Sequence, residues 1–430
     1  MLPKTSPSTR SVVPLVAVLC WAIVVFDGYD LIVYGTVLPQ LLTEPGWHLT
    51  TSGAGLLGSL AFAGMLVGSV LAGALSDRLG RRRTMIACAV WFSVFTALCA
   101  VASGPVTFGG LRFLAGLGLG GLVPSANALA AEFVSPRHRS VVATLMMSGV
   151  PLGGCLASLV GIVVLPRFGW PAMFLIALVA VCVVVPVAVK LLPESPLWLR
   201  AKGRVAEALA IEERFGVTVA EAEPVPATSR PLWTLVRPPY RRAIVLFSLV
   251  TLASLFTWYG LTTWLPQLMR QSGFDLGPAL TFLLALSIGA VLGSLVTAWV
   301  STRLGPLPTG VAAALAASAG LLVLMTHPST VVAYGALVLT GIGTHGTQCL
   351  VLGAVANHYP AHLRGSALGL VVGFGRIGAV LAPQVGGWLL AAGLGINTNF
   401  LVFALAAAAA AALLACCPRA PSENEGVSPA

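Results

Sequence analysis

Gly64-Met-Leu-Val-Gly-Ser-Val-Leu-Ala-Gly-Ala-Leu-Ser-Asp-Arg-Leu-Gly80 is a stretch that recurs later in this chain in a related form. The second copy reads Gly289-Ala-Val-Leu-Gly-Ser-Leu-Val-Thr-Ala-Trp-Val-Ser-Thr-Arg-Leu-Gly305, displaced by 225 positions at both ends (64 to 289 and 80 to 305). Each copy is an apolar stretch with glycines four residues apart, followed by a short charged segment. A duplication of this kind is typical of secondary transporters built from two similar helical bundles, which bind substrate near the middle of the membrane.

The composition extends this interpretation to the whole chain. Of the 430 residues, 57% are hydrophobic and 9% are charged, with a mean hydropathy of +0.93, whereas a soluble domain has roughly 25% charged residues. About twelve apolar stretches approach the roughly 20 residues that cross a bilayer. They lie near 13–39, 54–75, 84–103, 107–131, 141–164, 171–191, 243–268, 278–300, 309–326, 330–355, 366–391 and 396–417.

We therefore predict an all-α membrane protein with twelve transmembrane helices in two pseudo-symmetric six-helix bundles. The N-terminal bundle covers residues 1–192 and the C-terminal bundle covers residues 243–418. A cytoplasmic linker (193–242) joins the bundles, and a disordered cytoplasmic tail (419–430) follows them.

The net charge of +10 is distributed unevenly along the chain. With both termini in the cytoplasm, only Arg167 and Arg270 among the loop arginines face outward, which is the positive-inside pattern. The basic surplus thus indicates topology in the cell membrane and contact with lipid headgroups, and it does not indicate a nucleic-acid partner.

Two aspartates one helical turn apart, Asp27 and Asp30, interrupt the first apolar stretch. Acidic side chains are expensive at membrane depth, so they usually mark an ion, proton or substrate path. Two carboxylates on one helix face do not easily stay ionised together, and we expect at least one to take up a proton readily. The alternative is that they make structural hydrogen bonds to facing helices.

Arg112 and Arg376 are the basic residues that fall inside apolar stretches. Arginine keeps its charge in an apolar environment and therefore needs an anionic or carbonyl partner. Its planar guanidinium suits a substrate carboxylate, and a permanent pair with Asp27 or Asp30 is the alternative.

Several motifs together resemble those of one family. The segment Gly73–Arg83 resembles the signature loop of the major facilitator superfamily, and Pro193–Leu199 resembles the motif after helix six of its sugar and organic-acid branches. Asp27-Gly-Tyr-Asp30 is similar to the first-helix signature of aromatic acid/proton symporters, and Arg112 and Gly373–Ala379 fit the same family. The resemblance implies that Arg112 and Arg376 handle a carboxylate and that the transporter works as a monomer.

Candidate substrate contacts lie in three helices. His345 near the middle of the tenth stretch can donate a hydrogen bond to a substrate or be a satisfied interhelical histidine, and Gln348 shares its face. Aromatic rings can stack on an aromatic substrate. These rings are Phe26, Tyr29, Tyr34, Trp258, Tyr259 and Trp264, of which we expect Trp264 to be an interfacial anchor.

Charged residues of the cytoplasmic segments form a predicted gate. We expect ion pairs among them to hold the inward side closed and to break when the carrier opens. The gate residues are Asp77, Arg78, Arg81, Glu132 and Arg364, with Arg82 nearby. In the second copy Thr302 replaces Asp77, although an acidic residue is usual there in these symporters, so we expect a weaker second gate.

Other classes of protein fit the sequence less well. Gly116–Gly121 matches a nucleotide-binding glycine pattern, but it lies in an apolar stretch without a preceding strand, which favours helix packing. The eight cysteines show neither metal-ligand spacing nor a disulfide framework. We therefore expect no enzyme, no metal and no cofactor, with the proton as coupling ion.

The leading hypothesis is a secondary transporter that imports a benzoate-like or hydroxylated aromatic carboxylate with protons by alternating access. A proton-coupled carrier of a non-aromatic organic or sugar acid is the second hypothesis. A drug/proton antiporter is the third, because Gly149–Gly154 matches the antiporter pattern of helix five imperfectly.

Overall fold

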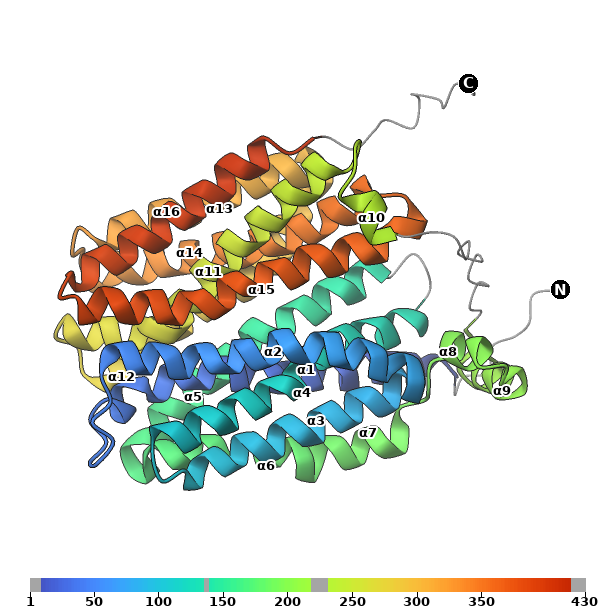
Figure 1. The fold of residues 1–430 in the computed structure, drawn as a ribbon, viewed down its shortest axis with the longest axis horizontal. Helices are drawn as coiled ribbons and strands as arrows, with labels where there is room; N and C mark the ends of the chain where they lie inside the picture. Colours follow the sequence, from blue (N-terminus) through green and yellow to red (C-terminus); the bar gives the residue numbers. More distant parts are fainter. Residues whose placement is uncertain (1–8, 135–138, 218–230, 419–430) are drawn as a thin grey trace. The chain divides into compact units, whose positions relative to one another are not determined.

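A computed structural model describes residues 9–134, 139–217 and 231–418, in which all regular secondary structure is helical (Figure 1). The predicted disordered tail lies outside the described residues. In chain order the elements are α1 (Thr9–Leu41), α2 (Thr51–Leu79), α3 (Arg81–Leu98), η1 (Cys99–Val101), α4 (Pro105–Glu132), α5 (Arg139–Leu175), α6 (Ala177–Val179), the π-helix η3 (Ala180–Val184), α7 (Val185–Leu191), α8 (Pro196–Ala201), α9 (Val205–Phe215), α10 (Pro231–Leu235), α11 (Arg241–Gln271), α12 (Leu276–Leu304), α13 (Pro306–Leu324), α14 (Thr330–His358), α15 (Ala361–Ala391) and α16 (Gly395–Ala415).

The predicted all-helical membrane fold is confirmed. In the described residues, 11 helices are long and apolar enough to cross a membrane, and a shorter apolar helix covers Ala177–Leu191. The fifth and sixth predicted stretches meet inside α5, where Gly169 leaves the helical conformation with φ of 70°. Helices suit these stretches because a helix satisfies its own backbone hydrogen bonds in a solvent that offers none.

The described chain divides into two compact units, which we describe separately. Unit 1 comprises residues 1–223, 260–288 and 383–396. Unit 2 comprises residues 224–259, 289–382 and 397–430. The assignment of the chain to two six-helix bundles with a linker between them stays a prediction.

Glycines set the spacing of helices in unit 1, where α2 packs along α4 and α1 along α5. A Cβ on Gly64 or Gly68 of α2 would overlap the backbone of α4, and a Cβ on Gly116 or Gly120 would overlap the backbone of α2. Reciprocal glycines of this kind let two helices approach to backbone contact. The helix-packing interpretation of the Gly116–Gly121 pattern is thereby confirmed.

The second copy of the repeat makes an equivalent contact in unit 2. A Cβ on Gly289 would meet the backbone of Val338 in α14, and a Cβ on Gly293 would meet that of Ile342. The repeated glycines therefore allow the same close approach of two helix backbones in both copies. This explains why the glycine spacing recurs although most other residues differ.

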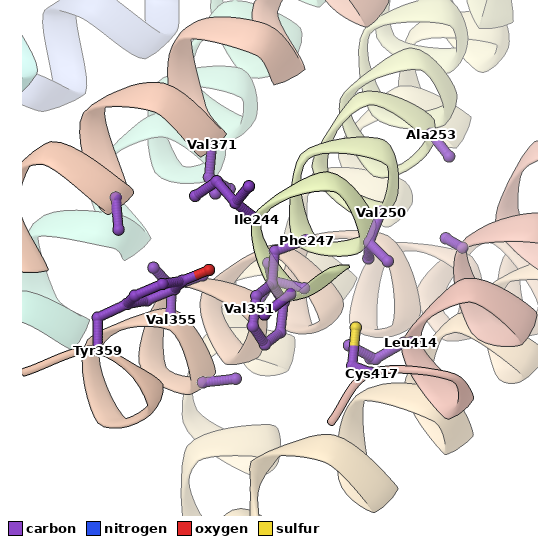
Figure 2. Packing of buried hydrophobic residues seen from close by; sticks show 14 of the residues in the cluster. Ile244, Phe247, Val250, Ala253, Val351, Val355, Tyr359, Val371, Leu414 and Cys417 are labelled. Atoms are coloured by element: carbon purple, nitrogen blue, oxygen red, sulfur yellow. The ribbon is translucent and has the colours of Figure 1, made fainter. Parts of the chain in front are cut away.

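The core of unit 2 gathers side chains from the five long helices α11, α13, α14, α15 and α16, and Figure 2 shows part of this cluster. Phe247 and Val250 come from α11, Val351 from α14, Val371 from α15 and Leu414 from α16, and all five are buried. Because lipid is as apolar as these side chains, close packing rather than escape from water holds such a cluster together.

The prediction that Trp264 is an interfacial anchor is wrong. The side chain is fully buried in unit 1, and its Nε1 donates a hydrogen bond of 2.8 Å to the backbone oxygen of Pro383. The sequence placed Trp264 near the end of a stretch that stops at 268, but α11 continues to Gln271. The residue therefore lies about two turns inside the helix end.

Candidate functional site

The centre of the candidate site is a buried ion pair between α1 and α4 in unit 1. Arg112 Nη1 lies 3.0 Å and 2.9 Å from the two carboxylate oxygens of Asp30, and Arg112 Nη2 donates to the Asp30 backbone oxygen at 3.1 Å. From α3, the Thr96 hydroxyl donates to Asp30 Oδ1 at 2.5 Å. Asp30 and Thr96 are completely buried, and Arg112 is 1% exposed.

This geometry explains how two opposite charges persist in an apolar interior. Each charge alone would be strongly destabilising there, whereas together they are balanced and hydrogen-bonded. Of the two alternatives for Arg112, the structure shows the pair with Asp30. The carboxylate-binding role of Arg112 stays a prediction, and it requires that this pair opens.

A cluster of aromatic rings lies against the ion pair. The Phe174 ring is 6.0 Å from the Arg112 guanidinium carbon, and Phe108 meets Phe174 edge-on at 5.3 Å between centroids. Trp47 and Trp170 extend the cluster, and Trp170 Nε1 donates to Glu44 Oε2 at 2.7 Å. The guanidinium therefore contacts the face of a ring on one side, which is favourable for a desolvated cation.

The other candidates from α1 occupy different surroundings. Asp27 is completely buried one turn from Asp30, and Phe26 is half-buried. Tyr34 is buried with its hydroxyl donating to the Ala54 backbone oxygen at 2.6 Å, and Tyr29 donates to the Met173 backbone oxygen at 2.9 Å. Both tyrosine hydroxyls thus tie α1 to neighbouring helices of unit 1.

Unit 2 carries the remaining substrate candidates. His345 of α14 is buried with its ring 5.7 Å from that of Trp258 in α11, and Tyr259 follows Trp258 in the same helix. Gln348 is partly buried, and its Oε1 is enclosed without a hydrogen-bond donor among the described residues. Arg376 of α15 is 7% exposed. Rings, an open acceptor and a buried cation therefore occur in one unit.

Glu132 is the centre of a polar cluster at one end of unit 1, the end predicted to be cytoplasmic. Its carboxylate forms an ion pair with Arg81 at the start of α3. The Ser195 hydroxyl lies 2.8 Å and 2.7 Å from its two oxygens, and the Leu197 amide donates at 3.3 Å. The ion pair therefore connects α3 to α4, and the hydrogen bonds from Ser195 and Leu197 connect the start of α8 to the same carboxylate, all within one unit.

Glu194 completes this cluster by accepting a hydrogen bond from an amide in the first turn of α3. Its Oε1 accepts from the Arg82 backbone amide at 2.9 Å, in the way a capping residue would. Gly80, with φ of 99°, leaves the room for this carboxylate, since a Cβ there would collide with Glu194. The motif Pro193–Leu199 therefore packs directly against the loop after α2.

The remaining predicted gate residues are exposed. These are Asp77 and Arg78 at the end of α2, and Arg364 of unit 2. The Asp77 backbone oxygen accepts from Trp198 Nε1 at 3.0 Å. At the equivalent position of the second copy, the Thr302 hydroxyl donates to the Trp299 backbone oxygen of its own helix at 2.7 Å. The gating role of all five residues stays a prediction.

Sequence reasoning missed Thr96 and the Trp170–Glu44 contact, and it included Ser195 only as part of the Pro193–Leu199 motif, without a role of its own. Thr96 is one of several small polar residues in its apolar stretch, so nothing in the local pattern distinguishes it. Glu44 follows the first apolar stretch, but Trp170 lies 126 residues further along the chain, so no local pattern predicts their contact.

The membrane-length helices, with equivalent glycine contacts in both copies of the repeat, define a polytopic membrane protein with a duplicated helical architecture, which is the class that includes secondary transporters. The family model described as Major Facilitator Superfamily matches residues 20–383 and 285–430. The chain therefore belongs to the major facilitator superfamily, as its motifs predicted.

Two of the curated relatives align with almost the whole chain. The gentisate transporter of Corynebacterium glutamicum is 48% identical over 397 residues, covering 91% of this chain and 85% of the relative. The benzoate transport protein of Acinetobacter baylyi is 31% identical over 406 residues, covering 91% and 86%. The predicted resemblance to aromatic acid transporters is confirmed.

Among solved structures, the xylose transporter XylE from E. coli, in a partially occluded inward open conformation, superposes with a TM-score of 0.75. The match covers 94% of this chain and 97% of that one at 16% identity. At this level of identity the likeness concerns the fold alone.

Proposed function

We propose that this protein imports an aromatic carboxylate, of the benzoate or hydroxybenzoate kind, together with protons by alternating access. The observation that carries the substrate class is the 48% identity with a gentisate transporter over 91% of this chain. The observation that supports proton coupling is the completely buried Asp30, held by Arg112 in the middle of an apolar bundle.

The ion pair supplies a means of coupling. While Asp30 is ionised, Arg112 is balanced and the pair is stable. When Asp30 takes up a proton, its attraction for the guanidinium falls and Arg112 becomes available to another anion. A proton on Asp30 and a carboxylate substrate on Arg112 can in this way replace the ion pair together, with Asp27 as a second proton carrier one turn away.

Arg376 is the proposed partner of the substrate carboxylate in unit 2, because its planar guanidinium can bind both oxygens of a carboxylate. His345, Trp258 and Tyr259 are proposed to contact the aromatic ring, and Gln348 to accept a hydrogen bond from a ring hydroxyl. The enclosed Gln348 Oε1 supports this last assignment, since a buried acceptor without a donor is unfavourable.

The test uses purified protein in proteoliposomes with an imposed pH gradient, acidic outside. Radiolabelled gentisate and benzoate are offered against a panel of aromatic, aliphatic and sugar acids as competitors. We expect aromatic acids alone to compete, and uptake to stop when a protonophore collapses the gradient. Competition by aliphatic or sugar acids would replace the proposed substrate class, and efflux driven by the same gradient would indicate an antiporter.

Asp30→Asn tests the coupling residue in the same vesicles. The amide keeps the shape of the side chain but binds no exchangeable proton, so we expect accumulation driven by the gradient to vanish. Undiminished accumulation by this variant would remove Asp30 from the mechanism.

A further inference from the structure

Thr96 of α3 is the second side chain, beside Arg112, that hydrogen-bonds to Asp30, and no motif in the sequence draws attention to it. Its hydroxyl and the Asp30 side chain are both completely buried, with 2.5 Å between Thr96 Oγ1 and Asp30 Oδ1. Other buried threonines behave differently: the hydroxyls of Thr340, Thr344 and Thr347 donate to carbonyls of their own helix, at 2.9 Å or less. Thr96 instead points its hydroxyl at a side chain of another helix.

We propose that Thr96 is a positioning residue for proton coupling, whose hydroxyl holds the ionised Asp30 on Arg112 and reverses its hydrogen bond when Asp30 is protonated. The inference rests on the proposed proton-coupled transport. A hydroxyl is suited to this task because it donates one hydrogen bond and also accepts, whereas the guanidinium of Arg112 only donates.

The two protonation states use the hydroxyl in opposite directions. With Asp30 ionised, Thr96 donates to Oδ1 while Arg112 donates to both oxygens. With a proton on Oδ1, Asp30 becomes the donor, and the Thr96 oxygen accepts while its own proton turns to a carbonyl of α3 one turn back. Arg112 then keeps at most one carboxyl oxygen and is freed for another anion.

In the described part of the chain, few other charged or titratable groups lie close enough to Asp30 to affect its protonation. Arg112 comes from α4, Cys99 from η1 after α3, and Tyr29 and Asp27 from α1 itself. The kinked end of α5 contributes the Phe174 ring and the Met173 carbonyl, neither of which titrates. In the described residues, Thr96 and Arg112 are the side chains that hydrogen-bond to the carboxylate.

The test compares Thr96→Val with Thr96→Ser and with Thr84→Val. Valine keeps the volume of threonine without the hydroxyl, and serine keeps the hydroxyl. Thr84 is a matched control, since it is equally buried in α3 and its hydroxyl has no hydrogen-bond partner among the described residues. Uptake of radiolabelled gentisate is measured against external pH, beside substrate exchange at equal pH on both sides.

Loss of the donor removes a stabilising contact from the ionised carboxylate. For Thr96→Val we expect the pH of half-maximal uptake to rise by about one unit, since a hydrogen bond to a charged group has that effect. Exchange at equal pH should remain, and Thr96→Ser and Thr84→Val should follow the unmodified protein. Coincident profiles for Thr96→Val and the unmodified protein would overturn the proposal, as would an equal shift in Thr84→Val.

A second measurement separates this proposal from the transport function. The C=O stretching band of protonated Asp30, assigned by its loss in Asp30→Asn, is followed by infrared titration of the purified protein. Thr96→Val should raise the titration midpoint even if uptake turns out to be independent of the pH gradient. An unchanged midpoint refutes the role of Thr96, whereas a gradient-independent uptake with a shifted midpoint refutes only the coupling.

Discussion

Replacing Arg112 should lower the stability of unit 1. Arg112→Gln leaves the Asp30 carboxylate buried without its counter-charge, and removal of one partner of a buried pair destabilises by about 3–5 kcal/mol. We expect a clearly lower thermal unfolding temperature in detergent, followed by intrinsic fluorescence. The double variant Asp30→Asn/Arg112→Gln carries no buried charge at this site and should recover most of the lost stability without regaining proton-driven uptake.

The comparison of the two variants decides what the pair does. If Arg112→Gln is as stable as the unmodified protein, the ion pair does not hold α1 and α4 together. If the double variant is less stable than the single one, the hydrogen bond that the ionised Asp30 accepts from Thr96 matters more than the balance of charge.

Arg376 offers a test of substrate recognition at a single residue. Lysine keeps the charge but lacks the planar pair of donors that fits a carboxylate. We therefore expect Arg376→Lys to weaken binding of benzoate at least tenfold, on the order of 1.4 kcal/mol, while binding of the neutral benzamide changes little. Quenching of tryptophan fluorescence measures both, and the exposed Arg364→Lys in the same helix serves as control. Equal losses for both ligands would indicate a structural role.

The chemistry of these residues could be predicted more readily than their pairing. Ionisable side chains in apolar stretches identified Asp27, Asp30, Arg112 and Arg376 as candidates, because burial of charge is unfavourable wherever the helices lie. Whether Arg112 meets Asp27 or Asp30 depends on the rotation of α4 against α1. That rotation is set by side-chain packing over the whole contact and has no local signature.

At the scale of helices, the contact between α2 and α4 provides a matched pair of variants. A Cβ on Gly120 would collide with backbone atoms of α2, whereas Gly110 in the same helix has open space around it. We expect Gly120→Ala to lower the unfolding temperature and the yield of folded protein. Gly110→Ala should be neutral or stabilising by up to about 1 kcal/mol, because alanine favours helix.

The outcome of this pair bears on the repeat as well. Gly120→Ala behaving like Gly110→Ala would mean that α2 and α4 can separate without loss, and the glycine spacing would need another explanation. A strong effect should reappear with Gly289→Ala in unit 2, where a Cβ would collide with the backbone of Val338 in α14.

Helix identity followed from the sequence, but the exact ends of the helices did not. Unbroken apolar stretches predict helices because no other local structure satisfies its backbone in lipid. The ends depend on how far each helix extends past the bilayer, and α11 extends to Gln271, which places Trp264 inside the bundle. The break at Gly169 falls between the predicted stretches 141–164 and 171–191, and glycine allows the positive φ that it requires.

At the scale of the whole molecule, the number of buried acids sets the electrical behaviour of transport. An aromatic carboxylate enters as an anion, and each charge moved across 100 mV involves about 2.3 kcal/mol, or about fifty-fold in accumulation. If Asp27 and Asp30 each carry a proton in every cycle, one net positive charge enters with the substrate. We expect this outcome, since both carboxylates are completely buried on one face of α1.

The measurement imposes a potassium diffusion potential on proteoliposomes at equal pH on both sides. An inside-negative potential of about 100 mV should raise gentisate accumulation up to about fifty-fold in the unmodified protein. In Asp27→Asn one proton accompanies one anion, so the potential should have no effect while a pH gradient still drives uptake. Uptake by the unmodified protein that ignores the potential would leave Asp30 as the single proton carrier, and Asp27 would then be a structural residue of α1.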